Sequence, residues 1–176
     1  MTFWLEEVGP EGWYKASDEI DDRIAREFGD LRAQACAGQL RSWAATPRSA
    51  LALVILIDQF SRNLHRGTAE AYAHDPMCRA LAKMAIGRGF DLMTPEPGRQ
   101  FFYLPLEHSE SLPDQERSVR LFMTRMPSLP EEGWHAVISH RNVIRRFGRF
   151  PSRNAALGRK DTPAELTYRE EGGYMG

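Results

Sequence analysis

The sequence contains only two cysteines, Cys36 and Cys78, and they lie far apart along the chain. Neither belongs to a CxxC pair or to a Cys/His spacing, so the pattern does not predict a zinc site. We interpret both as free thiols that fill space in the core, as a reducing compartment allows. This interpretation favours a cytoplasmic protein without disulfides.

Long apolar runs and an excess of charge of either sign are also missing. The longest apolar run covers residues 50–57, far short of the ~20 residues of a membrane-spanning helix. Residues 1–7 carry two acids and no basic leader, so they do not resemble a signal peptide. The 23 Lys and Arg residues nearly balance the 24 Asp and Glu residues, for a formal net charge of -1. This balance predicts neither a membrane nor a nucleic acid as a partner.

Strand patterns are the third absence, because no segment alternates apolar and polar residues between hairpin turns. Apolar residues instead recur at three- and four-residue steps, as in Ile20, Ile24 and Phe28. The length of 176 residues fits one domain. We therefore predict an all-α protein with one helical domain over residues 1–170 and a frayed tail over 171–176.

Four dipeptides predict helix starts: Thr46-Pro47, Asp75-Pro76, Thr94-Pro95 and Thr162-Pro163. In each, the Thr or Asp side chain can accept from the free amides of a first turn, and the proline needs no amide partner there. Ser17 predicts a fifth start, since acids follow it and complement the helix dipole.

The predicted helix over residues 47–63 differs from the others. Residues 51–57 are apolar on every side, which is typical of a buried central helix. Residues 58–63 then become abruptly polar. We expect an antiparallel helical array around this helix, with its polar end at the floor of a pocket.

Asp58 and Arg62 are the first candidate functional residues. Their i,i+4 spacing places them on one face of the helix, where they can form an ion pair. The pair is either structural or part of a ligand site, because structural ion pairs resemble functional ones. In a cleft, Asp58 could act as a base or orient a substrate.

His108 is the second candidate, in a segment that Pro105 keeps from forming a smooth helix. Its neighbours Glu107 and Glu110 raise the question of a metal, but one histidine without a spacing such as HExxH does not predict a metal site. A hydrogen-bonded structural histidine is the alternative. Gln115 and Glu116 belong to the run 114–118 that opens the next helix, and we interpret most of this run as a solvated face. The alternative is that Gln115 or Glu116 points inward, because Val119 and Phe122 lie one turn on.

The segment 140–160 is the third candidate, because it gathers seven Arg and Lys residues and His140. Arginine forks match carboxylates and phosphates. The simpler interpretation is a solvated basic patch. A nucleic-acid surface would need a wider basic area, so a pocket for a small anion is the sharper hypothesis. Residues 149–154 loosely repeat the end of the helix at 58–63, and we predict that the two ends face each other.

These candidates divide into two groups, with no predicted metal ligand or cofactor. The catalytic candidates are Asp58, His108 and His140. The ligand-binding candidates are Gln59, Arg62, Asn63, Glu110, Gln115, Glu116, Arg149, Arg153 and Asn154.

Four segments, taken in order, resemble a bacterial family catalogued as domain of unknown function 924. They are residues 58–63, 101–110, 115–118 and 140–155. The similarity extends over about residues 3–165, and Ser61 stands where proline is expected in many members. The resemblance implies a tetratricopeptide-like, all-helical fold. It brings no reaction, cofactor or catalytic residue, so it assigns no role to any position.

Three functional hypotheses follow. The first is a protein that binds, and in one version converts, a small anionic metabolite in a polar Asp/His/Arg/Asn pocket. The second is a helical adaptor for a protein or peptide, by analogy with tetratricopeptide-like folds. In the third, the polar cluster is purely structural, since buried charges must be paired. A homodimer is compatible with the sequence, which does not require one.

Overall fold

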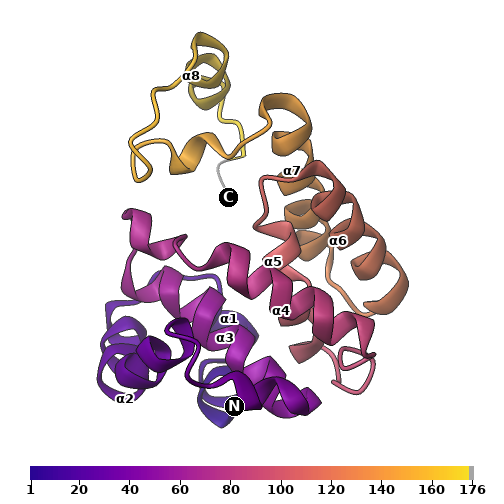
Figure 1. Cartoon of the computed structure of the whole chain (residues 1–176). Helices are drawn as coiled ribbons and strands as arrows, with labels where there is room; N and C mark the ends of the chain where they lie inside the picture. Colours follow the sequence, from indigo (N-terminus) through magenta and orange to yellow (C-terminus); the bar gives the residue numbers. More distant parts are fainter. Residues whose placement is uncertain (175–176) are drawn as a thin grey trace.

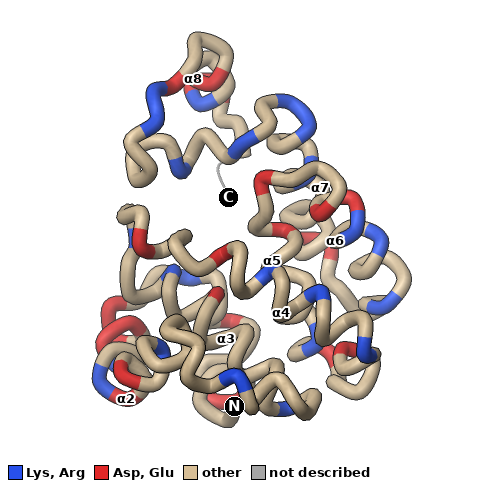
Figure 2. The backbone as a smooth tube through the Cα atoms, in the orientation of Figure 1, with Lys and Arg blue, Asp and Glu red and all other residues tan. Residues whose placement is uncertain are grey.

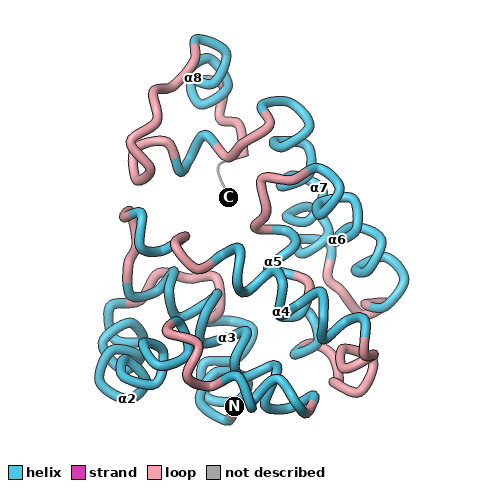
Figure 3. The backbone as a smooth tube through the Cα atoms, viewed as in Figure 1, coloured by secondary structure: helices cyan, strands magenta, loops and turns pink. Residues whose placement is uncertain are grey.

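The computed structural model describes residues 1–174, and within them every regular element is a helix (Figure 3). This confirms the predicted all-α class. The elements in chain order are η1 (Phe3–Val8), α1 (Gly9–Gly12), α2 (Asp18–Cys36), η2 (Arg41–Ala45), α3 (Pro47–Leu64), η3 (Ala69–Ala71), α4 (Asp75–Gly87), η4 (Gly98–Phe102), α5 (Leu104–Glu107), α6 (Leu112–Arg125), α7 (Glu131–Phe147), η5 (Pro151–Arg153) and α8 (Pro163–Glu170).

Helix α3 lies at the centre of the lower part of the molecule, between α2 and α4 (Figure 1). Thr46 caps it by accepting from the Ser49 amide, and Pro47 occupies the first turn. Ten of the eleven residues from 51 to 61 are buried, and only Ala52 in that run is partly exposed. Charged residues are concentrated on the elements around α3, which is mostly uncharged (Figure 2). The prediction of a central, apolar helix is confirmed.

An aromatic cluster fastens the N-terminal elements to α3. Trp4 packs edge-on against Phe60 of α3, with ring centroids 5.4 Å apart. Trp13 packs on Phe101 at 4.8 Å and donates from Nε1 to the Trp4 carbonyl. Offset and edge-on aromatic pairs add stability beyond the area that they bury. Phe60 lies directly after the polar pair Asp58-Gln59, so this packing also helps to position the polar end of α3.

The second half of the chain adds α5, α6 and α7 on one side of α4, and α8 stands apart above them (Figure 1). Thr162 and Glu165 form a complete capping box at the start of α8. Ser17 caps α2 by accepting from the Ile20 amide. The helix starts predicted at Ser17, Thr46 and Thr162 are therefore confirmed.

Two details of the predicted helix starts are wrong. No helix begins at Thr94-Pro95, where Thr94 Oγ1 donates back to the Phe90 carbonyl at 3.1 Å. A second proline at 97 also restricts the chain there, and only a short 3-10 turn follows. Helix α4 does begin at Asp75, but His74 is the N-cap residue. Asp75 instead turns its carboxylate toward Arg62.

Candidate functional site

Asp58 is the centre of the polar cluster, near the end of α3, where only 1% of its surface is exposed. Its Oδ1 lies 3.0 Å from Arg62 Nη1 and 2.9 Å from His108 Nδ1, and its Oδ2 accepts from Gln59 Nε2 at 2.6 Å. Burial alone would raise the pKa of Asp58, but Arg62 and His108 outweigh it and hold the pKa well below its ordinary value. Asp58 is therefore a permanent anion that orients its neighbours.

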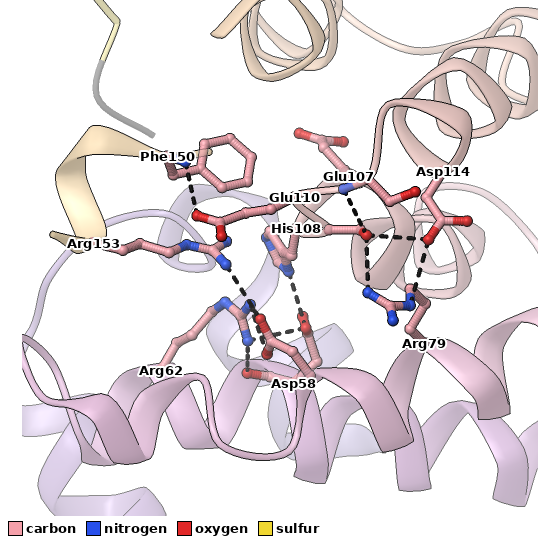
Figure 4. A network of polar contacts seen from close by, with 12 residues as sticks. Asp58, Arg62, Arg79, Glu107, His108, Glu110, Asp114, Phe150 and Arg153 are labelled. Atoms are coloured by element: carbon pink, nitrogen blue, oxygen red, sulfur yellow. Dashed lines mark hydrogen bonds and ion pairs between the residues drawn. The ribbon is translucent and has the colours of Figure 1, made fainter. Parts of the chain in front are cut away.

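His108 follows α5 directly and reaches toward Asp58 (Figure 4). Because Asp58 can only accept, Nδ1 of His108 carries the hydrogen and Nε2 is left with a lone pair when the ring is neutral. Burial and the nearby Arg62 guanidinium lower the pKa of His108 below its ordinary value, although Asp58 acts in the opposite direction. Near neutral pH, His108 is thus an uncharged base held in one orientation.

Glu107 and His140 form a second carboxylate–histidine pair beside the first. Glu107 Oε1 lies 3.0 Å from His140 Nδ1, and the Ala136 carbonyl lies 2.9 Å from the same nitrogen. Burial would lower the pKa of His140, but Glu107 and the Ala136 carbonyl raise it above its ordinary value. Glu107 is 3% exposed, and its Oε2 has no hydrogen-bond partner among residues 1–174. The second pair therefore favours the protonated imidazolium.

The two rings lie close together, with centroids 6.2 Å apart. Phe150 and Tyr174 pack edge-on against His140, with centroids at 5.6 and 5.1 Å. Within the part of the chain that the structure describes, Nε2 of neither histidine makes a hydrogen bond. Both pairs thus use Nδ1 to fix the ring and leave Nε2 available.

A chain of alternating charges runs beside the histidines. Asp75 accepts from Arg62 Nη2 at 3.0 Å and lies 3.4 Å from Arg153 Nη1. The Arg153 guanidinium is also stacked between Tyr72 and Phe150, at 4.6 and 4.4 Å from their ring centroids. Burial and the neighbouring Arg62 lower the pKa of Arg153. Arg62 and Arg153 thus alternate with the carboxylates of Asp58 and Asp75, and the contact of Arg153 with Asp75 is the longest of these ion pairs.

The two polar helix ends, which were predicted to face each other, are connected where Arg62 and Arg153 both form an ion pair with Asp75. Other candidates from these ends lie elsewhere. Asn63 donates to Asp21 of α2. Arg149 and Asn154 both donate to Glu165 of α8 and so hold that helix.

The remaining candidates support the cluster or lie outside it. Glu110 accepts from both Arg159 guanidinium nitrogens and from the Phe150 amide. Gln115 is fully buried, and its Nε2 donates to the Glu107 and Ser109 carbonyls. Gln115 therefore fixes the backbone on either side of His108. Glu116 lies on α6, partly exposed, with no hydrogen bond to the described residues.

Sequence reasoning missed four members of the cluster. They are Glu107 as the partner of His140, Asp75 as the bridge between arginines, Tyr72 and Tyr174. Tyr174 lies in the segment predicted to be frayed, yet its hydroxyl is 3.3 Å from His140 Nδ1. Positions 175–176 of that predicted tail lie outside the described residues. The proximity of Glu107 to His108 in the sequence was a usable signal, whereas nothing local marks Asp75 as a bridge.

Residues 1–173 match a family described as "Bacterial protein of unknown function (DUF924)". The chain belongs to this DUF924 family. A solved structure, titled as a protein of unknown function from Agrobacterium tumefaciens, is 39% identical and superposes with a TM-score of 0.90. The match covers 97% of this DUF924 chain and 95% of the other. No curated protein matches the sequence.

Two further findings concern residues 1–174. No helix in this range is both long and apolar enough to cross a membrane. No three His, Cys, Asp or Glu side chains in the same range are grouped so that they could hold a metal ion.

Proposed function

We propose that this DUF924 protein binds a small anionic metabolite beside His108 and His140 and transfers protons on it. One observation carries the proposal: two neighbouring histidines are each oriented through Nδ1 by a buried carboxylate, and each has an Nε2 without a hydrogen bond to residues 1–174. The arrangement is typical of acid–base sites, in which a third group fixes the ring.

The two histidines take different roles because their surroundings shift their pKa values in opposite directions. His108 has a lowered pKa and serves as the base. His140 has a raised pKa and serves as the acid. Separation of two titratable groups in this way is the usual basis of acid and base assignments. Arg153 supplies the positive charge for the anion, since its ion pair with Asp75 is long, at 3.4 Å, and Asp75 is already paired with Arg62 at 3.0 Å.

Ligand binding is tested with a thermal-shift screen of phosphorylated and carboxylated metabolites. A ligand that binds the native state must raise the melting temperature. We expect Arg153→Ala to weaken the affinity for the anion found in the screen about 10- to 100-fold. This loss corresponds to the ~1.5–3 kcal/mol of a charged hydrogen bond. Arg145→Ala is the matched control, because Arg145 is exposed on α7. A screen without any stabilising anion, or equal loss in both variants, would refute the proposal.

A structural role for the whole cluster is the competing interpretation, and one observation favours it. Asp58, Asp75 and Glu110 are each paired with at least one arginine. A double-mutant cycle between Asp58→Asn and His108→Gln separates the two interpretations. If the cluster is structural, the cycle gives a coupling energy in protein stability alone. If the proposed site is correct, the cycle also gives a coupling energy in the affinity for the anion found in the screen.

A further inference from the structure

A cavity lies away from the histidines, along α3. Its volume is about 510 Å3, within the roughly 300–1,000 Å3 of sites that hold small organic ligands. The walls are mostly apolar side chains from four regions: Phe3 and Trp4 of η1, Phe28 of α2, Trp43 of η2, and Leu56 of α3.

The charge around this cavity has one sign. No Asp or Glu lines it, and Arg48 is its one lining residue with a charged side chain. Arg48 is exposed at the first turn of α3 and forms no ion pair with any residue from 1 to 174. The positive end of the α3 dipole lies at the same place, beside Thr46 and Ser49. One end of the cavity therefore attracts an anion while its walls attract a hydrocarbon.

We propose that this cavity binds an anionic amphiphile, with a carboxylate at Arg48 and an unbranched hydrocarbon chain along α3 toward Phe60. The apolar walls exclude a strongly polar metabolite, and the absence of acids disfavours a cationic amphiphile. The free Arg48 guanidinium matches a carboxylate fork. The site is independent of the proposed histidine site, because Asp58 and His108 do not line it.

The proposal is tested on the full-length protein with decanoate, below its critical micelle concentration, by isothermal titration calorimetry. Trp4 and Trp43 line the cavity, so their fluorescence gives a second readout. We expect saturable binding at one site with a negative heat-capacity change, as burial of hydrocarbon requires. Decanol and decyltrimethylammonium are the comparison ligands, with the same chain and a neutral or positive head.

Two variants locate the ligand. Ala52→Met places a larger side chain in the cavity from a helical position, and we expect decanoate binding to fall at least tenfold. Arg48→Ala changes an exposed residue, so folding is preserved, and we expect about a fivefold loss for decanoate with no change for decanol. Arg41→Ala is the matched control, because Arg41 does not line this cavity.

The outcomes decide the proposal. Absence of saturable decanoate binding overturns it, and so does binding that Ala52→Met leaves unchanged. Equal affinity for decanoate and decyltrimethylammonium, or an equal effect of Arg48→Ala on decanoate and decanol, overturns the assignment of an anionic head. Decanoate binding that depends on both Ala52 and Arg48, but not on Arg41, supports it.

Discussion

Asp58 contacts three polar side chains, and it is almost completely shielded from water. Removing one member of such a buried group is costly, because the remaining charges stay buried without compensation. Arg62 would keep Asp75, but His108 would lose the acceptor that fixes its ring. Asp58 thus both stabilises α3 and orients His108, the proposed base.

We predict that Asp58→Asn lowers the free energy of unfolding by about 3–5 kcal/mol. Urea denaturation monitored by circular dichroism measures the change. Glu7→Gln is the control, because it breaks the exposed Arg23–Glu7 pair, whose loss should cost less than about 1 kcal/mol. Comparable losses in the two variants would mean that Asp58 is not a buried partner of the kind described.

Glu107 raises the pKa of His140, which gives a testable pH dependence. A group with a raised pKa in the folded state stabilises fully below its unfolded pKa, and this contribution is lost as the pH rises through the folded pKa. The Glu107–His140 pair should therefore stabilise the protein at pH 5–6 and weaken above the raised pKa. His108 has a lowered pKa, so its neutral form favours folding above about pH 6.5 and this is lost on acidification.

Titration of the histidine side chains by nuclear magnetic resonance checks both directions. We predict that His140 titrates above and His108 below the ordinary value of about 6.5. Glu107→Gln should lower the pKa of His140, because it removes the main charge that favours the imidazolium. An unchanged His140 titration in Glu107→Gln would contradict the pairing.

At the scale of elements, helix boundaries were predictable where a local side chain decides them. Thr46 and Thr162 accept from amides three residues ahead, an interaction that the dipeptide with proline already indicates. Thr94 precedes a proline in the same way, but donates to a carbonyl behind it. A threonine followed by a proline can therefore either cap a helix or form a turn. At Thr94-Pro95 a second proline, Pro97, lies nearby, and sequence reasoning overlooked it.

Contacts between elements were predictable only in part. Asp58 and Arg62 share one helix, so their spacing sufficed to predict the pair. The contact of Asp75 with Arg153 crosses 78 positions. Such a contact depends on how α4 and the C-terminal segment are placed, which no local pattern encodes. This is also why Arg149 was assigned to the site, although its fork is held by Glu165.

Glu165 has two structural roles in helix α8. It completes the capping box at the start of the helix, and it binds Arg149, which attaches the helix to the rest of the protein. Hydrogen bonds from Arg149, opposed by burial and aided by the Thr162 amide, lower the pKa of Glu165 to about 2. A lowered carboxyl pKa gives stability that is present above the unfolded value near 4.3 and lost as the pH falls toward the folded value. We predict that α8 detaches first between about pH 4 and pH 2.

Limited proteolysis with pepsin across this pH range measures the detachment of α8. Cleavage near residues 155–165 should appear in the wild type only as the pH falls. Glu165→Gln should be cleaved there already at the upper end of the range, because its side chain carries no charge to lose. Glu171→Gln, on an exposed residue after α8, is the control. Wild-type cleavage that is independent of pH would count against the role of Glu165.

At the scale of the whole molecule, the segment after α7 returns to the body and packs against His140 through Phe150. Glu110 is the main anchor of this segment, because its carboxylate accepts hydrogen bonds from Nη1 and Nη2 of Arg159 and from the Phe150 amide. Burial would raise its pKa, but Arg159 and the Phe150 amide lower it. Phe150, fixed in this way, is also one of the rings against His140. Anchoring of the segment and shielding of His140 therefore depend on the same carboxylate.

The last prediction tests this dependence with Glu110→Gln, measured by hydrogen–deuterium exchange of the intact protein. Loss of a charge-assisted pair should increase exchange across residues 150–170 about tenfold, the effect of roughly 1.4 kcal/mol on a local opening equilibrium. Helices α2 and α3 should be unaffected, because the partners of Glu110 within residues 1–174 are Arg159 and Phe150. Glu116→Gln is the matched control, an identical change six residues away, at a side chain without a hydrogen bond or ion pair to the described residues. If both variants exchange alike, the C-terminal segment is held by its other contacts, and the cover over His140 is independent of Glu110.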